Sequence, residues 1–379
     1  MTDETPRPPS TWGVPQSPTA PAAEAPATAP GPTPSGAPAP AAPQVTPGSP
    51  GTDAPGRSAA TAAGADLRAS LAAVRTEVGK AVVGQDAAVT GLIIALLCRG
   101  HVLLEGVPGV AKTLLVRSLS GALSLGTKRV QFTPDLMPGD VTGSLVYDAR
   151  TAQFSFREGP VFTNLLLADE INRTPPKTQA SLLEAMEERQ VTVDGEPRLL
   201  PDPFVVVATQ NPVEYEGTYP LPEAQLDRFL LKLLLPLPER TDEVEVLARH
   251  AAGFDPRDLA AAGLRAVAGA DDLARAREQV ARVQVAQEVL GYVVDVCRAT
   301  RTSPSLGLGV SPRGATALLA TSRAWAWLCG RDYVTPDDVQ ALAHPTLRHR
   351  VQLRPEAEIE GVTAESVLDT VLASVPVPR

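Results

Sequence analysis

The segment Gly106–Thr113, which reads Gly-Val-Pro-Gly-Val-Ala-Lys-Thr, constrains the fold of this chain more than any other. A strand-like run, His101–Glu105, precedes it, and a helix-like run, Leu114–Leu119, follows it. This order predicts a phosphate-binding loop, because the backbone N–H groups of such a loop and of the next helix face an anion. Lys112 would reach the phosphates, and the Thr113 hydroxyl would bind Mg²⁺. The loop therefore predicts an α/β fold with a nucleotide site.

One position in this loop, Ala111, departs from the usual pattern, which has a glycine before the lysine. An alanine is tolerated there if its φ angle is negative, as at the start of a helix, because a methyl group then costs little. We therefore expect a negative φ at Ala111. A positive φ would undo this interpretation of the loop.

Composition and charge narrow the class of protein. The 379 residues, 44 % of them hydrophobic, leave room for two or three domains with a substantial core. A formal charge of −9 argues against a constitutive nucleic-acid surface, which normally shows as a basic patch. The longest apolar runs fall far short of the ~20 residues of a membrane span, and the polar, proline-rich N-terminus does not resemble a signal peptide. These features predict a cytoplasmic protein without a membrane span.

The cysteines and histidines do not indicate a metal site. Cys98, Cys297 and Cys329 are widely spaced and form no CxxC pair, which predicts reduced, partly buried thiols rather than a disulfide or zinc framework. His344 and His349 are too far apart to share one helix face as metal ligands. We expect both histidines on a helix surface.

The chain divides into three parts by composition. Residues 1–64 consist largely of Pro, Ala, Thr, Gly and Ser, and cannot bury enough apolar surface to offset their ordering entropy. We expect a disordered tether there, with a proline-motif ligand for a partner as the alternative. Residues 65–238 alternate strand-like and helical runs, which predicts an α/β core. Residues 239–379 are helical in pattern, and we expect no strands after Pro238.

Five short apolar runs predict a parallel sheet that helices cover on both faces. An opening helix is expected from about Asp66 to Gly79, and a second helix ends near Leu97. Two further segments, Gly143–Phe156 and Val191–Leu200, predict β-hairpins, the second of which turns at Asp194-Gly195. The predicted strands of the sheet are residues 101–105, 129–133, 164–168, 204–209 and 229–235, and the predicted C-terminal helices are residues 239–252, 271–300, 312–329 and 335–349.

Two of the predicted strands end in side chains that suit a nucleotide site. Asp169 and Glu170 follow an apolar run that we expect beside the strand of the phosphate-binding loop. Asp169 can hold Mg²⁺ through water, and Glu170 can polarise a water aimed at the γ-phosphate, although acids are also common where a buried strand meets solvent. Asn211, at the end of the next predicted strand, can bond the γ-phosphate or the attacking water, or can form a turn with Pro212.

Two arginines are candidates for binding an anion. Arg228 precedes the last predicted strand, and is either a structural cation paired with Asp227 or an arginine finger that enters a neighbouring subunit's site. Arg313 lies in the first turn of a helix that Ser311 caps and Pro312 begins. A cation there opposes the helix dipole, which favours anion binding over a purely structural role.

These motifs occur in the order found in AAA+ ATPases, and their wording resembles that of the MoxR family. The resemblance covers about residues 66–375 and does not include the tether. It implies Walker A roles for Lys112 and Thr113, Walker B roles for Asp169 and Glu170, and a sensor 1 role for Asn211. It also implies an arginine finger at Arg228 and sensor 2 at Arg313. The segments that carry the resemblance are Glu105–Thr113, Ala168–Met186, Ala208–Phe229 and Ser311–Ala315.

The resemblance implies an AAA+ core with a small helical lid domain, and a set of residues around ATP. Val83, Gly84 and Gln85 look like the segment that flanks the adenine base, and the hairpin at 143–156 sits where this clade carries an insertion. Thr113 and Asp169 are the implied Mg²⁺ residues. The implied nucleotide-binding residues are Val83, Gly84, Gln85, Gly106, Val107, Pro108, Gly109, Val110, Ala111, Lys112, Thr113, Leu114, Asp169 and Arg313; those implied for hydrolysis are Glu170, Lys112, Asn211, Arg228 and Arg313.

The family also implies how such a protein works. Its members hydrolyse ATP as rings, here expected to be hexameric, and remodel or mature partner proteins, which often carry von Willebrand factor A domains. Arg173 is either a second intersubunit contact or a solvated residue at a helix start. Two alternatives remain: a nucleic-acid remodelling motor, which the acidic charge disfavours, and a nucleotide-dependent binding switch with little turnover.

Overall fold

The computed structural model describes residues 55–150, 152–211 and 219–378, with only the helix itself described for residues 55–65. The chain forms two units, Met1–Ala63 and Gly64–Arg379, and the fold below is that of the second unit. Helix α1 (Pro55–Gly79) begins within the predicted tether, so residues 55–64 are helical where a disordered segment was expected, and the domain boundary near residue 64 stays a prediction. A proline at the first helical position and the alanine-rich run after it favour a helix there. Residues 1–54 of the predicted tether lie outside the described residues.

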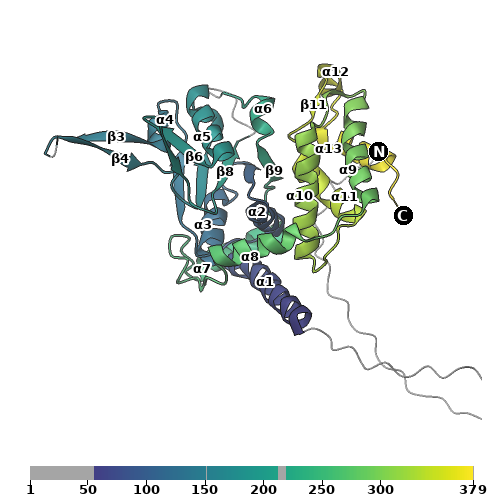
Figure 1. The fold of residues 1–379 in the computed structure, drawn as a ribbon, viewed down its shortest axis with the longest axis horizontal. Coiled ribbons are helices and arrows are strands. Elements are labelled where there is room, and N and C mark those ends of the chain that lie inside the picture. The colour runs from purple at the N-terminus through teal and green to yellow at the C-terminus, as the bar shows by residue number, and fades with distance from the viewer. Residues whose placement is uncertain (1–54, 151, 212–218, 379) are drawn as a thin grey trace, which may run out of the picture. The chain divides into compact units, whose positions relative to one another are not determined.

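A five-stranded parallel sheet lies at the centre of Gly64–Arg379, in the order β2–β5–β8–β1–β9 (Figure 1). The strands β1, β5 and β8 are buried almost throughout, as expected for strands covered on both faces. All five predicted strands are present, with small shifts at their ends. They are β1 (His101–Glu105), β2 (Thr127–Gln131), β5 (Leu165–Asp169), β8 (Val205–Gln210) and β9 (Phe229–Leu234).

The position of β8 corrects one prediction. It pairs with β5 on one side and with β1 on the other, so the strand of Asp169 does not border the strand of the phosphate-binding loop. Hydrophobic periodicity could not show this, because it records which residues are buried and not which strands are neighbours. All five strands run in the same direction, so their carboxyl ends still share one edge. The loop, the Asp169-Glu170 pair and Asn211 therefore come to the same edge of the sheet.

The helices of the core bury the positions that are apolar at helical spacing. In α1 the side chains of Leu71, Val74 and Val78 are fully buried, which confirms the opening helix. The second predicted helix is also confirmed. This second helix is α2 (Asp86–Leu97). The remaining helices of this part are α3 (Lys112–Ala122), α4 (Pro138–Thr142), the 3-10 helix η1 (Ile171–Arg173), α5 (Pro176–Glu188) and α6 (Glu223–Leu226).

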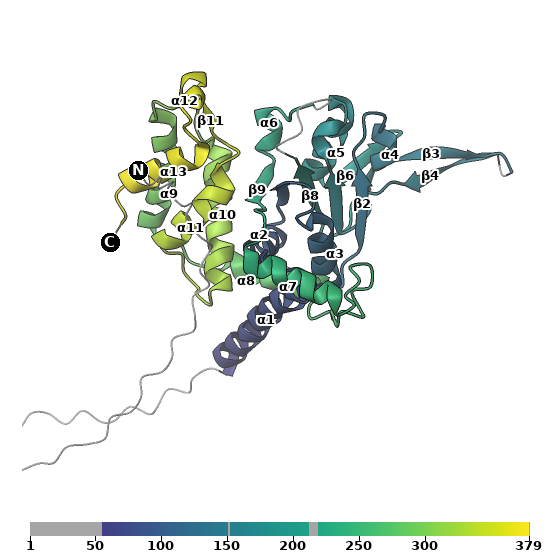
Figure 2. The ribbon, with the colours of Figure 1, turned by 180° about the vertical axis from the view of Figure 1, so that it is seen from behind.

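Both predicted hairpins are confirmed. The first pairs β3 (Gly143–Asp148) with β4 (Gln153–Glu158), and the second pairs β6 (Gln190–Val193) with β7 (Glu196–Leu199). Asp194 and Gly195 turn the second hairpin with positive φ angles of 55° and 77°. The first hairpin extends away from the sheet in both views (Figure 2). It leaves apolar side chains exposed on its surface.

The C-terminal part is helical, with two corrections. The predicted helix at 271–300 is two helices, because the backbone of Gln284 leaves the helical path to bond Asp332 and Val334. Two short strands, β10 (Leu306–Leu308) and β11 (Gln352–Leu353), pair after Pro238, where none was expected, because such short strands carry no periodicity. The helices are α7 (Arg240–Ala251), α8 (Ala270–Ala281), α9 (Gln287–Thr302), α10 (Pro312–Leu328), α11 (Pro336–Leu347), α12 (Pro355–Ile359) and α13 (Ala364–Ser374).

The cysteines follow the prediction, and one histidine does not. The three cysteines are free, and burial raises the pKa of Cys98 to about 12. His349, expected on a helix surface, is buried and bonds the Phe229 carbonyl at 2.9 Å. It lies just beyond α11, where the chain turns back onto β9. In the part of the chain that is described, no helix has both the length and the apolar character to cross a bilayer.

Candidate functional site

Lys112 begins α3 directly after the loop that leaves β1. Its ammonium group donates to the carbonyl oxygens of Gly106, at 2.5 Å, and of Gln210, at 3.3 Å. One carbonyl follows β1 and the other ends β8, so Lys112 lies across the carboxyl ends of two neighbouring strands. A Cβ atom added to Gly106 would lie 2.7 Å from the Leu235 carbonyl oxygen, which explains why glycine opens the loop. The loop thus places the Lys112 ammonium group at the carboxyl edge of the sheet.

The backbone at Ala111 contradicts the prediction. Its φ angle is +59°, in the left-handed region, whereas we expected a negative value. A residue with a Cβ atom costs about 1 kcal/mol there, because the Cβ crowds the following carbonyl oxygen. By the criterion stated for this loop, its sequence alone no longer supports a phosphate site. The assignment rests instead on the position of Lys112 and on the side chains that β2, β5 and β8 bring to the same edge.

Asp169 ends β5 with both carboxylate oxygens engaged. Its Oδ1 accepts a hydrogen bond from the Thr209 hydroxyl at 2.5 Å, and its Oδ2 lies 2.7 Å from Nη2 of Arg129. Thr209 comes from β8 and Arg129 from β2, the strands on either side of β5. Asp169 is therefore a carboxylate at the sheet edge that already faces a cation.

Glu170 follows directly and has a left-handed backbone, with φ at 58°. Its Oε2 accepts a hydrogen bond from Nε2 of Gln131 at 2.6 Å and pairs with Arg173 at 3.1 Å. Its backbone N–H donates to the Thr209 hydroxyl at 2.9 Å, so this one hydroxyl holds both acids in place. Since Arg173 pairs with Glu170 of its own chain, an intersubunit contact for Arg173 stays a prediction.

Two further predicted segments lie around the loop. Asn211 is buried at the carboxyl end of β8, between β5 and β1. Gln85 is buried too, and its Nε2 donates to the Pro236 carbonyl at 3.3 Å, one residue beyond the Leu235 carbonyl that approaches Gly106. The structure therefore brings Val83–Gln85 to the side of the loop. The residues that follow Asn211, 212–218, lie outside the described part of the chain.

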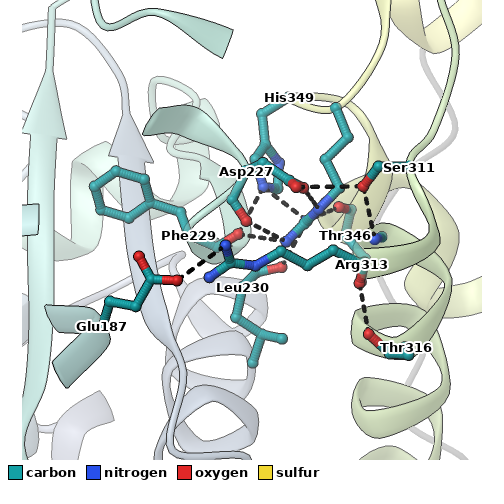
Figure 3. A network of polar contacts seen from close by, with 11 residues as sticks. Glu187, Asp227, Phe229, Leu230, Ser311, Arg313, Thr316, Thr346 and His349 are labelled. Atoms are coloured by element: carbon teal, nitrogen blue, oxygen red, sulfur yellow. Dashed lines mark hydrogen bonds and ion pairs between the residues drawn. The ribbon is translucent and has the colours of Figure 1, made fainter. Parts of the chain in front are cut away.

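Arg228 and Arg313 lie elsewhere. Arg228 directly precedes β9, whose first residue, Phe229, pairs with His101 at the start of β1. The loop follows the other end of β1, so the length of that strand, about 13 Å, separates the two edges. Arg228 is thus at the amino edge of the sheet, opposite Lys112. Arg313 is beside it, because both arginines pair with Glu187. Figure 3 shows the contact between Glu187 and Arg313.

A cavity of about 300 Å³ adjoins these arginines. It lies where the start of β1 and the end of α5 meet the first turns of α10, away from the phosphate-binding loop. Five arginines and two carboxylates line it, which leaves an excess of three positive charges. The charged lining residues are Arg99, Arg189, Arg228, Arg313, Arg350, Glu187 and Asp227. This surface suits an anion.

The residues at the loop edge fit Mg²⁺ and a nucleotide by their chemistry. Thr113 offers a hydroxyl and Asp169 a carboxylate, which are the hard oxygen ligands that Mg²⁺ prefers. Within the described residues, no group of three or more His, Cys, Asp or Glu side chains could hold a metal ion. A Mg²⁺ ion at this edge would therefore need ligands beyond the protein, as the phosphates of a nucleotide supply.

Replacing Arg129 with glutamine tests whether the Asp169 carboxylate binds Mg²⁺. Because Arg129 is half-exposed, its ion pair with Asp169 is weak, but it still competes with another cation. We expect Arg129→Gln to lower the Mg²⁺ concentration for half-maximal binding of a fluorescent ATP analogue by about two- to fivefold. Lys128→Gln, which removes an exposed charge from the same strand, is the matched control and should change nothing. A higher Mg²⁺ requirement in Arg129→Gln would mean that Arg129 supports the metal site.

Several residues of these two sites were not predicted. Thr209 and Gln131 could have been found from the sequence, since each is a polar residue near the carboxyl end of a strand that reaches the loop edge. Glu187 carries one too, because an acid in the last turn of a helix faces the negative end of its dipole. Arg129 gave no signal, because charged residues on a strand at a sheet edge are common.

Two segments of the sequence match known families. Residues 101–231 match the ATPase family associated with various cellular activities (AAA), and residues 298–371 match the AAA lid domain. These matches lie within the predicted core, 65–238, and the predicted lid, 239–379. The exact domain boundaries stay predictions.

Full-length relatives show the same similarity. The chain is 49 % identical to the uncharacterized protein YeaC of Bacillus subtilis, over 83 % of this chain and 96 % of that protein. It is 42 % identical to the chaperone MoxR1 of Mycobacterium tuberculosis, over 80 % of this chain and 81 % of that protein. A crystal structure from Cytophaga hutchinsonii, described provisionally as an ATPase, has a TM-score of 0.79 and 38 % identity, and covers 86 % of this chain and 99 % of its own.

Proposed function

Because the chain belongs to the MoxR family of AAA+ ATPases, we propose that it binds ATP with Mg²⁺ and hydrolyses it in a ring of identical chains. The observation that carries the proposal is the separation of the two candidate sites across the sheet. Lys112, Asp169 and Glu170 lie at the carboxyl edge, and Arg228 and Arg313 lie at the amino edge. Arg228 directly precedes β9, so one chain cannot bring it to the edge of Lys112 without unfolding the sheet.

The loop edge supplies the groups that act on the nucleotide in cis. Lys112 and the backbone N–H groups from Gly106 to Thr113 bind the phosphates, with Val83–Gln85 beside the base. Thr113 and Asp169 hold Mg²⁺, which would neutralise charge on the phosphates. Glu170 orients and deprotonates the attacking water, and Gln131 and Thr209 fix its carboxylate and its backbone. Asn211 completes this edge near the γ-phosphate.

The arginine edge serves the neighbouring chain. Arg228 and Arg313 come from different parts of the chain but share one carboxylate, so they face the same space. We assign both to the phosphates of a nucleotide on the adjacent chain, where a guanidinium stabilises the charge of the transition state. A closed ring, proposed to be hexameric, gives every nucleotide a neighbour.

The client is proposed to be a protein. The relative from Mycobacterium tuberculosis is a chaperone, and partners with von Willebrand factor A domains are the proposed clients here. The β3–β4 hairpin supports a protein client, because Tyr147 and Phe154 are 53 % and 68 % exposed near its tip with their ring centroids 5.2 Å apart. A Glu170→Gln protein held in ATP, used as bait, would identify the client.

The proposed function requires ATP turnover that depends on assembly. We expect the full chain to hydrolyse Mg·ATP with a turnover per chain that rises about tenfold or more as protein concentration passes the range in which rings form, because the arginine edge must come from a second chain. The measurement is phosphate release against protein concentration, with the assembly state followed by analytical ultracentrifugation. A turnover per chain that is independent of concentration in a monomeric protein would contradict the ring.

A further inference from the structure

Glu187 holds the two anion-binding arginines at the same time. One carboxylate oxygen lies 3.1 Å from Nη2 of Arg228, and the other lies 3.5 Å from Nη1 of Arg313. Arg228 belongs to the core and Arg313 to the first turn of the lid helix α10, so the carboxylate bridges two parts of the chain. Its contact with Arg313 is drawn in Figure 3. Neither arginine can offer its full charge to another anion while this bridge exists.

The backbones that carry the two arginines are fixed by other contacts. Arg350, which is almost fully buried, donates to Asp227 at 2.8 Å and to the carbonyl oxygens of Phe229 and Leu230. The Ser311 hydroxyl, which caps α10, also donates to Asp227, at 3.2 Å. Asp227 directly precedes Arg228, so its contact with Ser311 connects the start of α10 to the segment that carries Arg228. With both backbones held, the guanidinium groups and the Glu187 carboxylate are the parts that can change partners.

The bridge itself is weak enough to break. The side chains of Glu187, Arg228 and Arg313 are 41 %, 30 % and 48 % exposed. Ion pairs at such exposure contribute only about 0–1 kcal/mol each, because water screens both charges. A triphosphate carries more negative charge than one carboxylate and accepts several hydrogen bonds from each guanidinium. A phosphate group that reaches this surface would displace Glu187.

The charges that line the adjoining cavity favour such a displacement. The adjoining cavity has three more arginines than carboxylates, and His101 in its wall adds no charge, because burial lowers its pKa to about 4. Asp227 is committed to Arg350 and Ser311, so Glu187 is the carboxylate of this lining that is free to swing away. The helix also favours its release, since Glu187 sits in the last turn of α5, at the negative end of the dipole.

We propose that Glu187 is a latch: its carboxylate occupies Arg228 and Arg313 in the separate chain, and the phosphates of a nucleotide on the adjacent chain displace it. This inference rests on the proposed function. Glu187 touches neither nucleotide nor water in it, and acts as a positioning residue through the two arginines. The latch lowers the affinity of one chain for the next until the next chain carries a nucleotide.

Glu187→Gln tests the latch, because it removes the charge and keeps the shape. We expect the protein concentration at half-maximal assembly in Mg·ATP, and that at half-maximal turnover, to fall roughly three- to tenfold, with the turnover at saturation unchanged. Glu188→Gln, one residue further along α5 and also exposed, is the matched control and should behave as the wild type. Glu187→Asp keeps the charge on a shorter stem and should return the midpoint toward that of the wild type.

Each other outcome has a definite meaning. A lower saturated turnover in Glu187→Gln with an unchanged midpoint would overturn the latch, because Glu187 would then align the arginines in the active ring. Equal midpoints for Glu187→Gln and Glu188→Gln would overturn it as well. If the wild type assembles in ATP but does not hydrolyse it, the proposed hydrolysis fails and the assembly midpoints still decide the latch. If it does neither, both fail. Thermal unfolding of each variant checks that it is folded.

Discussion

Glu170→Gln is expected to lower ATP turnover by about 10²- to 10⁴-fold and to leave ATP binding intact. Glutamine has the size of glutamate and can still meet Gln131, but it cannot take a proton from the attacking water. The Thr209 bond to the backbone at residue 170 also survives, so the turn keeps its shape. Phosphate release under saturating ATP gives the turnover, and titration with a fluorescent analogue gives the affinity.

The control for this variant is Glu278→Gln, an exposed acid of α8 in the C-terminal part of the chain. It should retain the turnover of the wild type. Slow hydrolysis that is the same in the wild type and in Glu170→Gln would instead support a nucleotide-dependent binding switch. Stimulation of turnover by DNA, but by no candidate protein, would support a nucleic-acid motor.

Mixing Lys112→Ala chains with Arg228→Ala chains is expected to restore activity that neither has alone. In a ring, a working site needs Lys112 on one chain and Arg228 on the next. At equal amounts and random order, about a quarter of the interfaces meet both conditions, so turnover should recover to at most about 25 % of the wild type. Phosphate release from the mixture, measured after rings have been allowed to exchange chains, gives the result.

The position of Arg313 provides a sharper control for the mixture. Because Arg228 and Arg313 of one chain lie side by side, both within reach of Glu187, we expect the same neighbour to supply both arginines. Mixing Arg228→Ala chains with Arg313→Ala chains should therefore restore nothing, since no chain in that mixture carries an intact pair. Recovery in this second mixture would place the arginines in different sites. No recovery in the first mixture, despite mixed rings, would give Arg228 a role within its own chain.

The sheet and its motifs could be predicted because they depend on local pattern. Continuous apolar runs such as Val205–Ala208 and the Asp194-Gly195 turn specify strands and a hairpin through burial and backbone conformation alone. The order of the strands depends on which helices cross which face, and that information is not local. The position of β8 between β5 and β1 was therefore not predicted. The parallel direction of the strands was predicted, and it brings their carboxyl ends to one edge.

The candidate site divides in the same way. Residues that belong to a motif, such as Lys112, Asp169 and Arg228, could be proposed as site residues from their neighbours in the sequence. Partners brought in from other strands, such as Arg129 and Thr209, could not, because their contacts depend on register. Glu187 is the extreme case: one of its partners lies in the turn before β9 and the other in the lid. The prediction that His349 lies on a helix surface was wrong for a similar reason, since the contact that buries it comes from β9.

Ala111 and Glu170 share one further property. Each has a Cβ atom and a left-handed backbone, with φ near 60°. Ala111 lies in the phosphate-binding loop, and Glu170 is one of the two acids at the end of β5. Such a residue costs about 1–3 kcal/mol, and it persists only where the surrounding structure compels it. At Glu170 the chain itself supports this conformation, because the backbone N–H donates to the Thr209 hydroxyl at 2.9 Å. A nucleotide would meet a preorganised edge, and its binding free energy would not be reduced by ordering these turns.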